Sequence, residues 1–365
     1  MTPRRLLLLP ALLLAACQPD ERAATSPAAP DAPAGSASAA ATTSSRATIR
    51  PETRKFRDWL AVCDNANTCV AFGPAVDGNG GWIRVALDAG PAARAQITAG
   101  LVDRAAGPDG LALSVDGRRF ALADLPIEGS EASQGVIRDA GPEVIDALAK
   151  GRRLTLGDDV ALSPSGAAAA LLWIDERQGR LNTTTALMRR GAKPASTVPA
   201  APPLPVVAPA PAVAQTSLPR PALPAAFEAR ADVRQCRADT TFNPDLQREI
   251  TVDRLSPAQE LWGVPCFVGA YNFGLRYFVT GPNGADPRPV RFPTSREPTD
   301  EVVNGAYEPA SRTLSAFNKG RGVGDCGVET LWTWTGRDFA LTSETEMREC
   351  WGVPSALWST TWRSR

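Results

Sequence analysis

A proline-rich stretch near the middle of the sequence limits how this chain can fold. Residues 193–224 contain ten prolines set among alanine and valine. Proline fixes φ and lacks a backbone N–H, so such a stretch favours extended polyproline II and acts as a semi-rigid spacer. The stretch predicts two linked domains, one over 51–192 and one over 225–365, each of ordinary domain size.

The N-terminus predicts an exported protein. Within residues 1–16, Arg4 and Arg5 precede an apolar run that is too short to span a bilayer as a helix, which is typical of a signal peptide. Residues 17–50 are mostly Ala, Pro, Ser and Thr, and they predict a flexible tether that buries too little apolar surface to fold.

The end of this signal, Leu-Ala-Ala-Cys, resembles the lipobox of bacterial lipoproteins. The resemblance implies lipidation of Cys17, so the membrane is the first partner that we expect. Gln18 follows the cysteine, which by the rule for this class implies the outer membrane, with the protein facing the periplasm. The alternative is an ordinary secretory signal with a chance cysteine.

The absence of histidine excludes much chemistry. The chain has no histidine at all, so Ser-His-Asp catalysis, Cys-His catalysis and histidine metal ligands are ruled out. No Cys-x-x-Cys pair occurs either, and we expect no metal and no cofactor. The 39 basic and 39 acidic residues balance and interleave, which argues against nucleic acid as a partner.

The cysteines predict disulfides. With Cys17 assigned to lipid, six of the seven remain, and an even set in an oxidising compartment indicates bridges. Two of the six lie in the first predicted domain, so they form the natural first pair. The other four leave several pairings open, of which we favour the two between sequence neighbours. The favoured pairs are Cys63–Cys69, Cys236–Cys266 and Cys326–Cys350.

Short alternating segments between turn residues predict a fold that is mainly β, sandwich or barrel-like, with a few helices. The clearest hairpin joins 111–115 to 118–122 through Asp116-Gly117. Other predicted strands cover 56–63, 82–87, 154–156, 275–280, 330–334 and 339–342. A helix is predicted over 142–150, with Gly151 as its C-terminal cap. A second is predicted to run through 167–173, with Ser163 at the N-cap and Pro164 in the first turn.

Several phrases together resemble a proteobacterial family of exported proteins, a conserved domain of unknown function, over about 51–192 and 225–365. The first half is also similar to the invasion-associated locus B family, whose members are periplasmic. These resemblances imply an envelope location and two linked parts, and they supply no activity or catalytic residue. The phrases are Asp58-Trp59 with 63–65 and Cys69, the run 173–187, Gly-Ala-Tyr-Asn at 269–272, Gly-Arg-Gly-Val-Gly-Asp-Cys-Gly at 320–327, and Trp-Thr-Trp at 332–334.

Two features of the second half are candidate binding residues. The glycine-rich run 320–327 carries Arg321 and Asp325 and could hold a ligand, or it could be a tight connection that brings Cys326 to its partner. Trp332 and Trp334 share one face of a predicted strand. If exposed they form a stacking platform, and if buried they are core.

A polar run at 175–180 could similarly be a pocket rim, or a helix end that holds itself with local contacts. The leading hypothesis is a non-catalytic envelope module that binds a glycan or an envelope protein. The alternatives are a cell-wall hydrolase that works with two carboxylates and a passive structural lipoprotein.

Overall fold

The computed structural model describes residues 49–365, apart from 79, 129–131 and 216–221. The predicted signal peptide, Cys17 and nearly all of the predicted tether lie outside the described residues. Contacts group Arg46–Arg365 into one compact unit. Its described part has four antiparallel sheets and only four short α-helices, which confirms a mainly β fold. None of the described helices combines the length and the apolar character needed to cross a bilayer.

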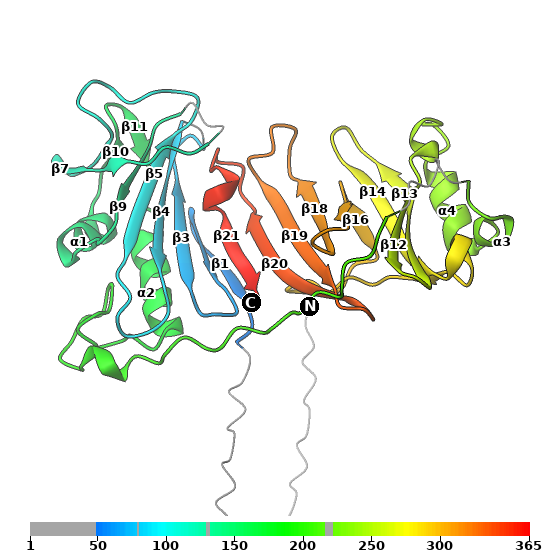
Figure 1. Cartoon of the computed structure of the whole chain (residues 1–365). Helices are drawn as coiled ribbons and strands as arrows, with labels where there is room; N and C mark the ends of the chain where they lie inside the picture. The colour runs from blue at the N-terminus through cyan, green and yellow to red at the C-terminus, as the bar shows by residue number, and fades with distance from the viewer. Residues whose placement is uncertain (1–48, 79, 129–131, 216–221) are drawn as a thin grey trace, which may run out of the picture. The chain divides into compact units, whose positions relative to one another are not determined.

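The first half contains two sheets (Figure 1). Sheet I has the strand order β1-β2-β3-β4-β5-β9-β8, and sheet II has the order β11-β10-β6-β7. Helices α1 (Pro142–Lys150) and α2 (Ala167–Arg177) contribute buried apolar side chains to the same core. The strands are β1 (Glu52–Phe56), β2 (Trp59–Cys63), β3 (Cys69–Pro74), β4 (Gly81–Leu87), β5 (Gln96–Leu101), β6 (Ala112–Val115), β7 (Arg118–Ala121), β8 (Ala123–Asp124), β9 (Gln134–Ile137), β10 (Leu154–Leu156) and β11 (Val160–Leu162).

The second half contains two more sheets that pack face to face. Sheet III has the order β12-β13-β14-β15, with β16 also paired to β14, and sheet IV runs from β17 to β21 in chain order. Helices α3 (Ala225–Glu228) and α4 (Ala231–Asp239) bury side chains against the other face of sheet III. The strands are β12 (Thr251–Ser256), β13 (Gln259–Val268), β14 (Phe273–Thr280), β15 (Arg288–Pro289), β16 (Glu301–Val303), β17 (Ala306–Glu308), β18 (Thr313–Lys319), β19 (Gly327–Trp334), β20 (Phe339–Met347) and β21 (Ser359–Arg363).

Three disulfides staple these sheets. They join Cys63 to Cys69, Cys236 to Cys266, and Cys326 to Cys350, which are the pairings favoured from the sequence. The first closes the β2–β3 turn, the second ties α4 to β13, and the third links the start of β19 to the segment after β20. The first and third bridges therefore fix turns at strand ends, and the second fixes a helix against the face of sheet III.

A shared hydrophobic cluster joins the two halves. Phe72 and Trp82 of sheet I pack with Met347, Val353 and Trp358 of the second half. The proline-rich stretch also makes backbone hydrogen bonds to β19 and to the residue that follows β21 by two positions. Val207 N–H donates to the Arg365 carbonyl, and Ala210 N–H donates to the Trp334 carbonyl, both at 2.9 Å. The division into two domains that fold separately stays a prediction.

Local sequence signals predict one turn correctly and miss two other details of the chain path. The β6–β7 hairpin turns at Asp116 and Gly117, both with positive φ, as a type I′ turn requires. The single predicted strand over 56–63 is wrong, because Arg57 adopts a φ of 54° and separates β1 from β2. Ser163 is not an N-cap. Gly166 occupies that position with a φ of 111°.

Candidate functional site

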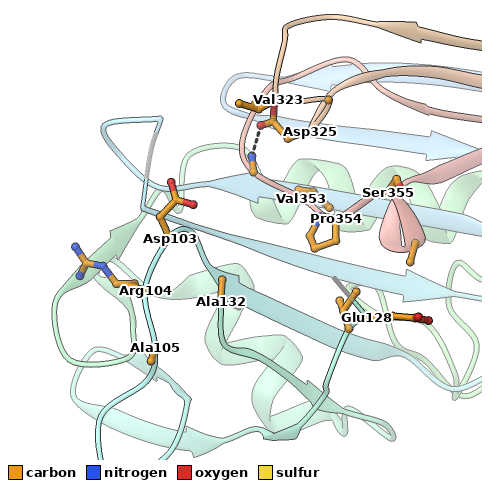
Figure 2. Close-up of a pocket in the computed structure, with 14 residues that line it drawn as sticks. Asp103, Arg104, Ala105, Glu128, Ala132, Val323, Asp325, Val353, Pro354 and Ser355 are labelled. Carbon is orange, nitrogen blue, oxygen red and sulfur yellow. Dashed lines mark hydrogen bonds between the residues drawn. The ribbon is translucent and has the colours of Figure 1, made fainter. Parts of the chain in front are cut away.

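A cleft of about 770 Å³ opens between the two halves of the compact unit. Figure 2 shows Val323 and Asp325 on one side of it and Asp103 and Arg104 on the other. Its walls are turns rather than strands, and turns can vary in sequence without disturbing the sheets that hold them. The lining residues are Asp103, Arg104, Ala105, Ile127, Glu128, Ala132, Val323, Gly324, Asp325, Gly352, Val353, Pro354, Ser355 and Ala356.

Asp325 fixes the wall contributed by the second half. The Arg321 guanidinium donates two hydrogen bonds of 2.6 Å to its carboxylate, and Gly352 N–H donates a third at 2.8 Å. Burial by itself would raise the pKa of Asp325, but the hydrogen bonds from Arg321 and Gly352 outweigh it, and the pKa lies below its ordinary value. The Cys326–Cys350 disulfide joins the same two segments. The wall is therefore held in place covalently and ionically.

A tight turn after β5 forms the opposite wall. Asp103 has a φ of 54°, a left-handed conformation that Asp tolerates better than most residues. Ser133 ties the turn down, because its N–H donates to the Arg104 carbonyl at 3.2 Å and its hydroxyl accepts from Ala106 N–H at 2.8 Å. The Arg104 guanidinium is paired with Asp159 at 2.8 Å.

The cleft has a definite charge pattern. Both arginines at its edge, Arg104 and Arg321, already have carboxylate partners. Asp103 and Glu128 are exposed and form no ion pair with any residue that the structure describes. Between these charges lie small apolar side chains, including Val323, which is 79% exposed. The Arg321 charge acts on Asp103 only at a distance, so the cleft presents negative charge beside apolar surface, and none of its described lining residues is aromatic.

The structure separates the four predicted binding residues. Arg321 and Asp325 lie at the cleft, as a pair. Trp332 and Trp334 are only 2% and 1% exposed, so the predicted stacking platform is wrong. Both indoles face sheet III, where the ring centroids of Trp332 and Phe292 are 4.9 Å apart. Two sheets that pack face to face bury one side of each strand, and these tryptophans are on that side.

The glycine-rich run 320–327 is also a tight connection. A Cβ on Gly327, which has a φ of 141°, would lie 2.2 Å from the Asn318 carbonyl oxygen. Asp325 together with the sulfurs of Cys326 and Cys350 falls within 4.8 Å, but these sulfurs are bonded to each other and offer no thiolate to a metal. Glycine at 327 thus serves the turn, while Arg321 and Asp325 define the cleft wall.

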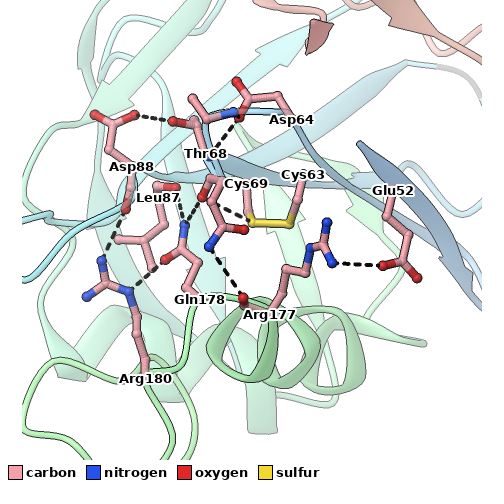
Figure 3. Close-up of a disulfide and its surroundings, with 12 residues drawn as sticks. Glu52, Cys63, Asp64, Thr68, Cys69, Leu87, Asp88, Arg177, Gln178 and Arg180 are labelled. Carbon is pink, nitrogen blue, oxygen red and sulfur yellow. Dashed lines mark hydrogen bonds and ion pairs between the residues drawn. A yellow bond between two sulfur atoms is a disulfide. The ribbon is translucent and has the colours of Figure 1, made fainter. Parts of the chain in front are cut away.

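The polar run 175–180 is structural. Asp175 accepts hydrogen bonds from the backbone N–H groups of Leu187 and Met188, at 2.6 and 2.7 Å. Figure 3 shows Gln178 and Arg180 reaching the ends of β2–β3 and β4. Gln178 donates to the Leu87 carbonyl at 3.0 Å. These side chains satisfy backbone groups of the neighbouring turns, such as the Asn67, Leu87 and Gly90 carbonyls, and leave no open rim.

Sequence reasoning missed Asp103, Glu128 and Ala356. Nothing in their local sequence marks them, since they are single residues in three separate turns. The one usable signal was the pairing of Cys326 with Cys350, which predicts that 320–327 and the segment after 350 lie together.

Comparisons with known proteins give this chain a family without giving it a function. A family model described as a protein of unknown function, DUF1176, matches residues 53–365. An Escherichia coli K12 protein named uncharacterized protein YpfG is 31% identical over 340 residues, covering 86% of this chain and 94% of its own length. No solved structure matches the chain. The predicted similarity to the locus B family stays a prediction.

Proposed function

This chain belongs to the DUF1176 family of proteins of unknown function, and from its sequence and its cleft we propose that it is a non-catalytic binding protein of the cell envelope. In this proposal Cys17 carries the lipid, residues 17–50 are the tether, and the folded part faces the periplasm from the outer membrane. The support is the lipobox-like sequence and the six cysteines, whose three bridges suit an oxidising compartment.

The cleft is the observation that carries the binding role. We propose that the cleft binds a segment of an envelope protein, and that this segment bears basic and small apolar side chains. Asp103 and Glu128 offer exposed negative charge to basic groups, and Val323 and Ala356 offer apolar contact. Because Asp325 and Arg321 hold each other, the wall is organised before a partner arrives, which lowers the entropy cost of binding.

The hydrolase alternative finds less support. Cell-wall hydrolysis with two carboxyl groups needs one whose pKa is raised enough to donate a proton. In the cleft, Asp325 has a lowered pKa and is held as a carboxylate by Arg321. Burial and the nearby charge of Glu308 raise the pKa of Asp253 to about 6. Asp253 does not line the cleft, however.

Charge-removing variants test the proposal. We expect a synthetic peptide of alternating lysine and alanine to bind the mature chain, and its glutamate counterpart not to bind. Asp103→Asn and Glu128→Gln should each weaken the lysine peptide about threefold, since exposed pairs contribute little. Asn is chosen at 103 because it tolerates positive φ. Calorimetric titration at two salt concentrations measures both effects.

Glu297→Gln is the matched control, because Glu297 is exposed and lies outside the cleft. Equal binding of both peptides, or equal losses in all three variants, would count against the cleft. The hydrolase would instead be favoured if the wild type released soluble fragments from purified peptidoglycan and Glu128→Gln did not. A chain that shows neither activity would be left with the passive structural role.

A further inference from the structure

A second pocket lies on the face of sheet IV that points away from the buried tryptophans. Its volume is about 340 Å³, and it follows strands β18, β19 and β20. Six side chains decide its chemistry, and they form two rows across the strands. The rows are Ser315, Leu331 and Ser343, and next to it Phe317, Glu329 and Thr345.

Strand register explains this grouping. Side chains alternate between the two faces of a sheet, so residues two apart on each strand share a face. The same alternation that buries Trp332 against sheet III turns Leu331 and Glu329 outward. The pocket therefore has a floor of rigid backbone, with an apolar residue beside polar ones in each row.

Among the residues that the structure describes, Glu329 is the only charged side chain that lines this pocket. It is half-buried and forms no ion pair with any residue in the described part of the chain. Burial raises the pKa of Glu329, and the neighbouring hydroxyls of Thr345 and Ser355 oppose that rise only in part. A desolvated carboxylate without a cation gains from any hydrogen-bond donor that reaches it.

The hydroxyls of Ser315 and Ser343 add neutral hydrogen-bonding groups to the pocket. The Ser343 hydroxyl makes no hydrogen bond within the described structure, and the Ser315 hydroxyl donates only a long one, 3.2 Å, to the Ala306 carbonyl. Each hydroxyl can both donate and accept. Phe317 and Leu331 place apolar surface beside them, and Phe317 is itself supported by Trp358, with ring centroids 5.8 Å apart.

We propose that this pocket binds a neutral saccharide, with the Glu329 carboxylate accepting hydrogen bonds from sugar hydroxyls and Leu331 and Phe317 contacting the apolar face of the ring. Few precisely placed polar groups over an apolar base are what small-molecule sites require. Hydrolysis is not part of the proposal, because Glu329 is the single carboxylate of the lining. The pocket is separate from the cleft, and the proposal does not depend on the protein partner assigned there.

The proposal is tested by titrating the mature chain with N-acetylglucosamine tetramer and, separately, with maltotetraose. The readout is the NMR chemical shifts of the backbone amides of β18–β20. Saturable binding of at least one sugar is expected, with the shifts confined to these strands. Glu329→Gln should weaken binding about tenfold through loss of a charged acceptor. Ser343→Arg should abolish binding by filling the pocket.

Glu308→Gln is the matched control, since Glu308 lies on β17 of the same sheet but does not line the pocket. It should bind like the wild type. Thermal unfolding of each variant separates lost binding from lost fold, and the lysine peptide titration shows whether the cleft still works. Three results would overturn the proposal. They are no saturable binding of either sugar, sugar binding by Glu329→Gln and Ser343→Arg that equals that of the wild type, and tighter binding of trilysine than of either sugar.

Discussion

The Cys63–Cys69 turn and the Cys326–Cys350 loop contain the same three kinds of residue but differ in how deeply their aspartates are buried. Each has a disulfide, an aspartate next to one of its cysteines, and an arginine paired with that aspartate. The Asp64 side chain is fully buried, whereas that of Asp325 is 14% exposed. The first assembly seals its carboxylate inside the junction of the two halves while its Arg363 side chain stays 36% exposed, and the second borders a cleft.

Burial also reverses the electrostatics of the two aspartates. Desolvation raises the pKa of Asp64 despite Arg363 and two backbone N–H donors. At Asp325, desolvation is weaker than the hydrogen bonds from Arg321 and Gly352, and the pKa falls. The difference shows that a motif of cysteine, aspartate and arginine carries no fixed role, because the surrounding packing decides whether its charge is costly or favourable.

The largest expected contrast comes from removing each carboxylate. Asp64→Ala leaves Arg363 without its partner and the N–H groups of Ala66 and Thr68 without an acceptor. We expect a loss of about 3–5 kcal/mol in the free energy of unfolding. Asp325→Ala, at a partly buried pair, should cost less, about 1–2 kcal/mol. Urea unfolding at pH 7 measures both, and similar losses would remove the distinction between a sealed and an open site.

Removing each of the two disulfides should lower the free energy of unfolding by amounts that differ less than those of the two aspartate variants. Cys326 and Cys350 are 24 residues apart and Cys63 and Cys69 are 6 apart. The chain-entropy model therefore gives about 3.5 kcal/mol for the longer loop and about 2.3 kcal/mol for the shorter one. Replacing each pair with two alanines and comparing urea midpoints tests this order. A larger loss at Cys63–Cys69 would show that packing in the sealed turn outweighs loop length.

The smallest expected effect is a difference in pH dependence. Because the pKa of Asp64 is raised in the folded state, its favourable contribution is complete below pH 3.8 and is lost as the pH rises through the folded pKa. Asp325 has a lowered pKa, so its contribution is present above pH 3.8 and is lost as the pH falls through the folded pKa. Relative to wild type, Asp64→Asn should thus improve with rising pH, and Asp325→Asn should worsen. Chemical unfolding between pH 3 and 7 follows both, and slopes of the same sign would contradict this account.

Local signals in the sequence predicted the regular elements well. The helix over 142–150 has the predicted bounds, since proline at its start and glycine after its end act within a few residues. The hairpin at Asp116-Gly117 is equally local. The break at Arg57 was not predictable in this way, because a non-glycine residue with positive φ is kept only by the surrounding fold.

The sequence by itself determined the mainly β class, the favoured disulfide pairs and the exclusion of histidine chemistry, because each depends on residue identity or short-range spacing. The tertiary structure decided which side chains meet solvent. Trp332 went to the core and Glu329 to the surface because sheet III covers one face of β19 and not the other. The cleft likewise exists only because turns far apart in sequence, at 103–105, 323–325 and 352–356, come together when the two halves pack.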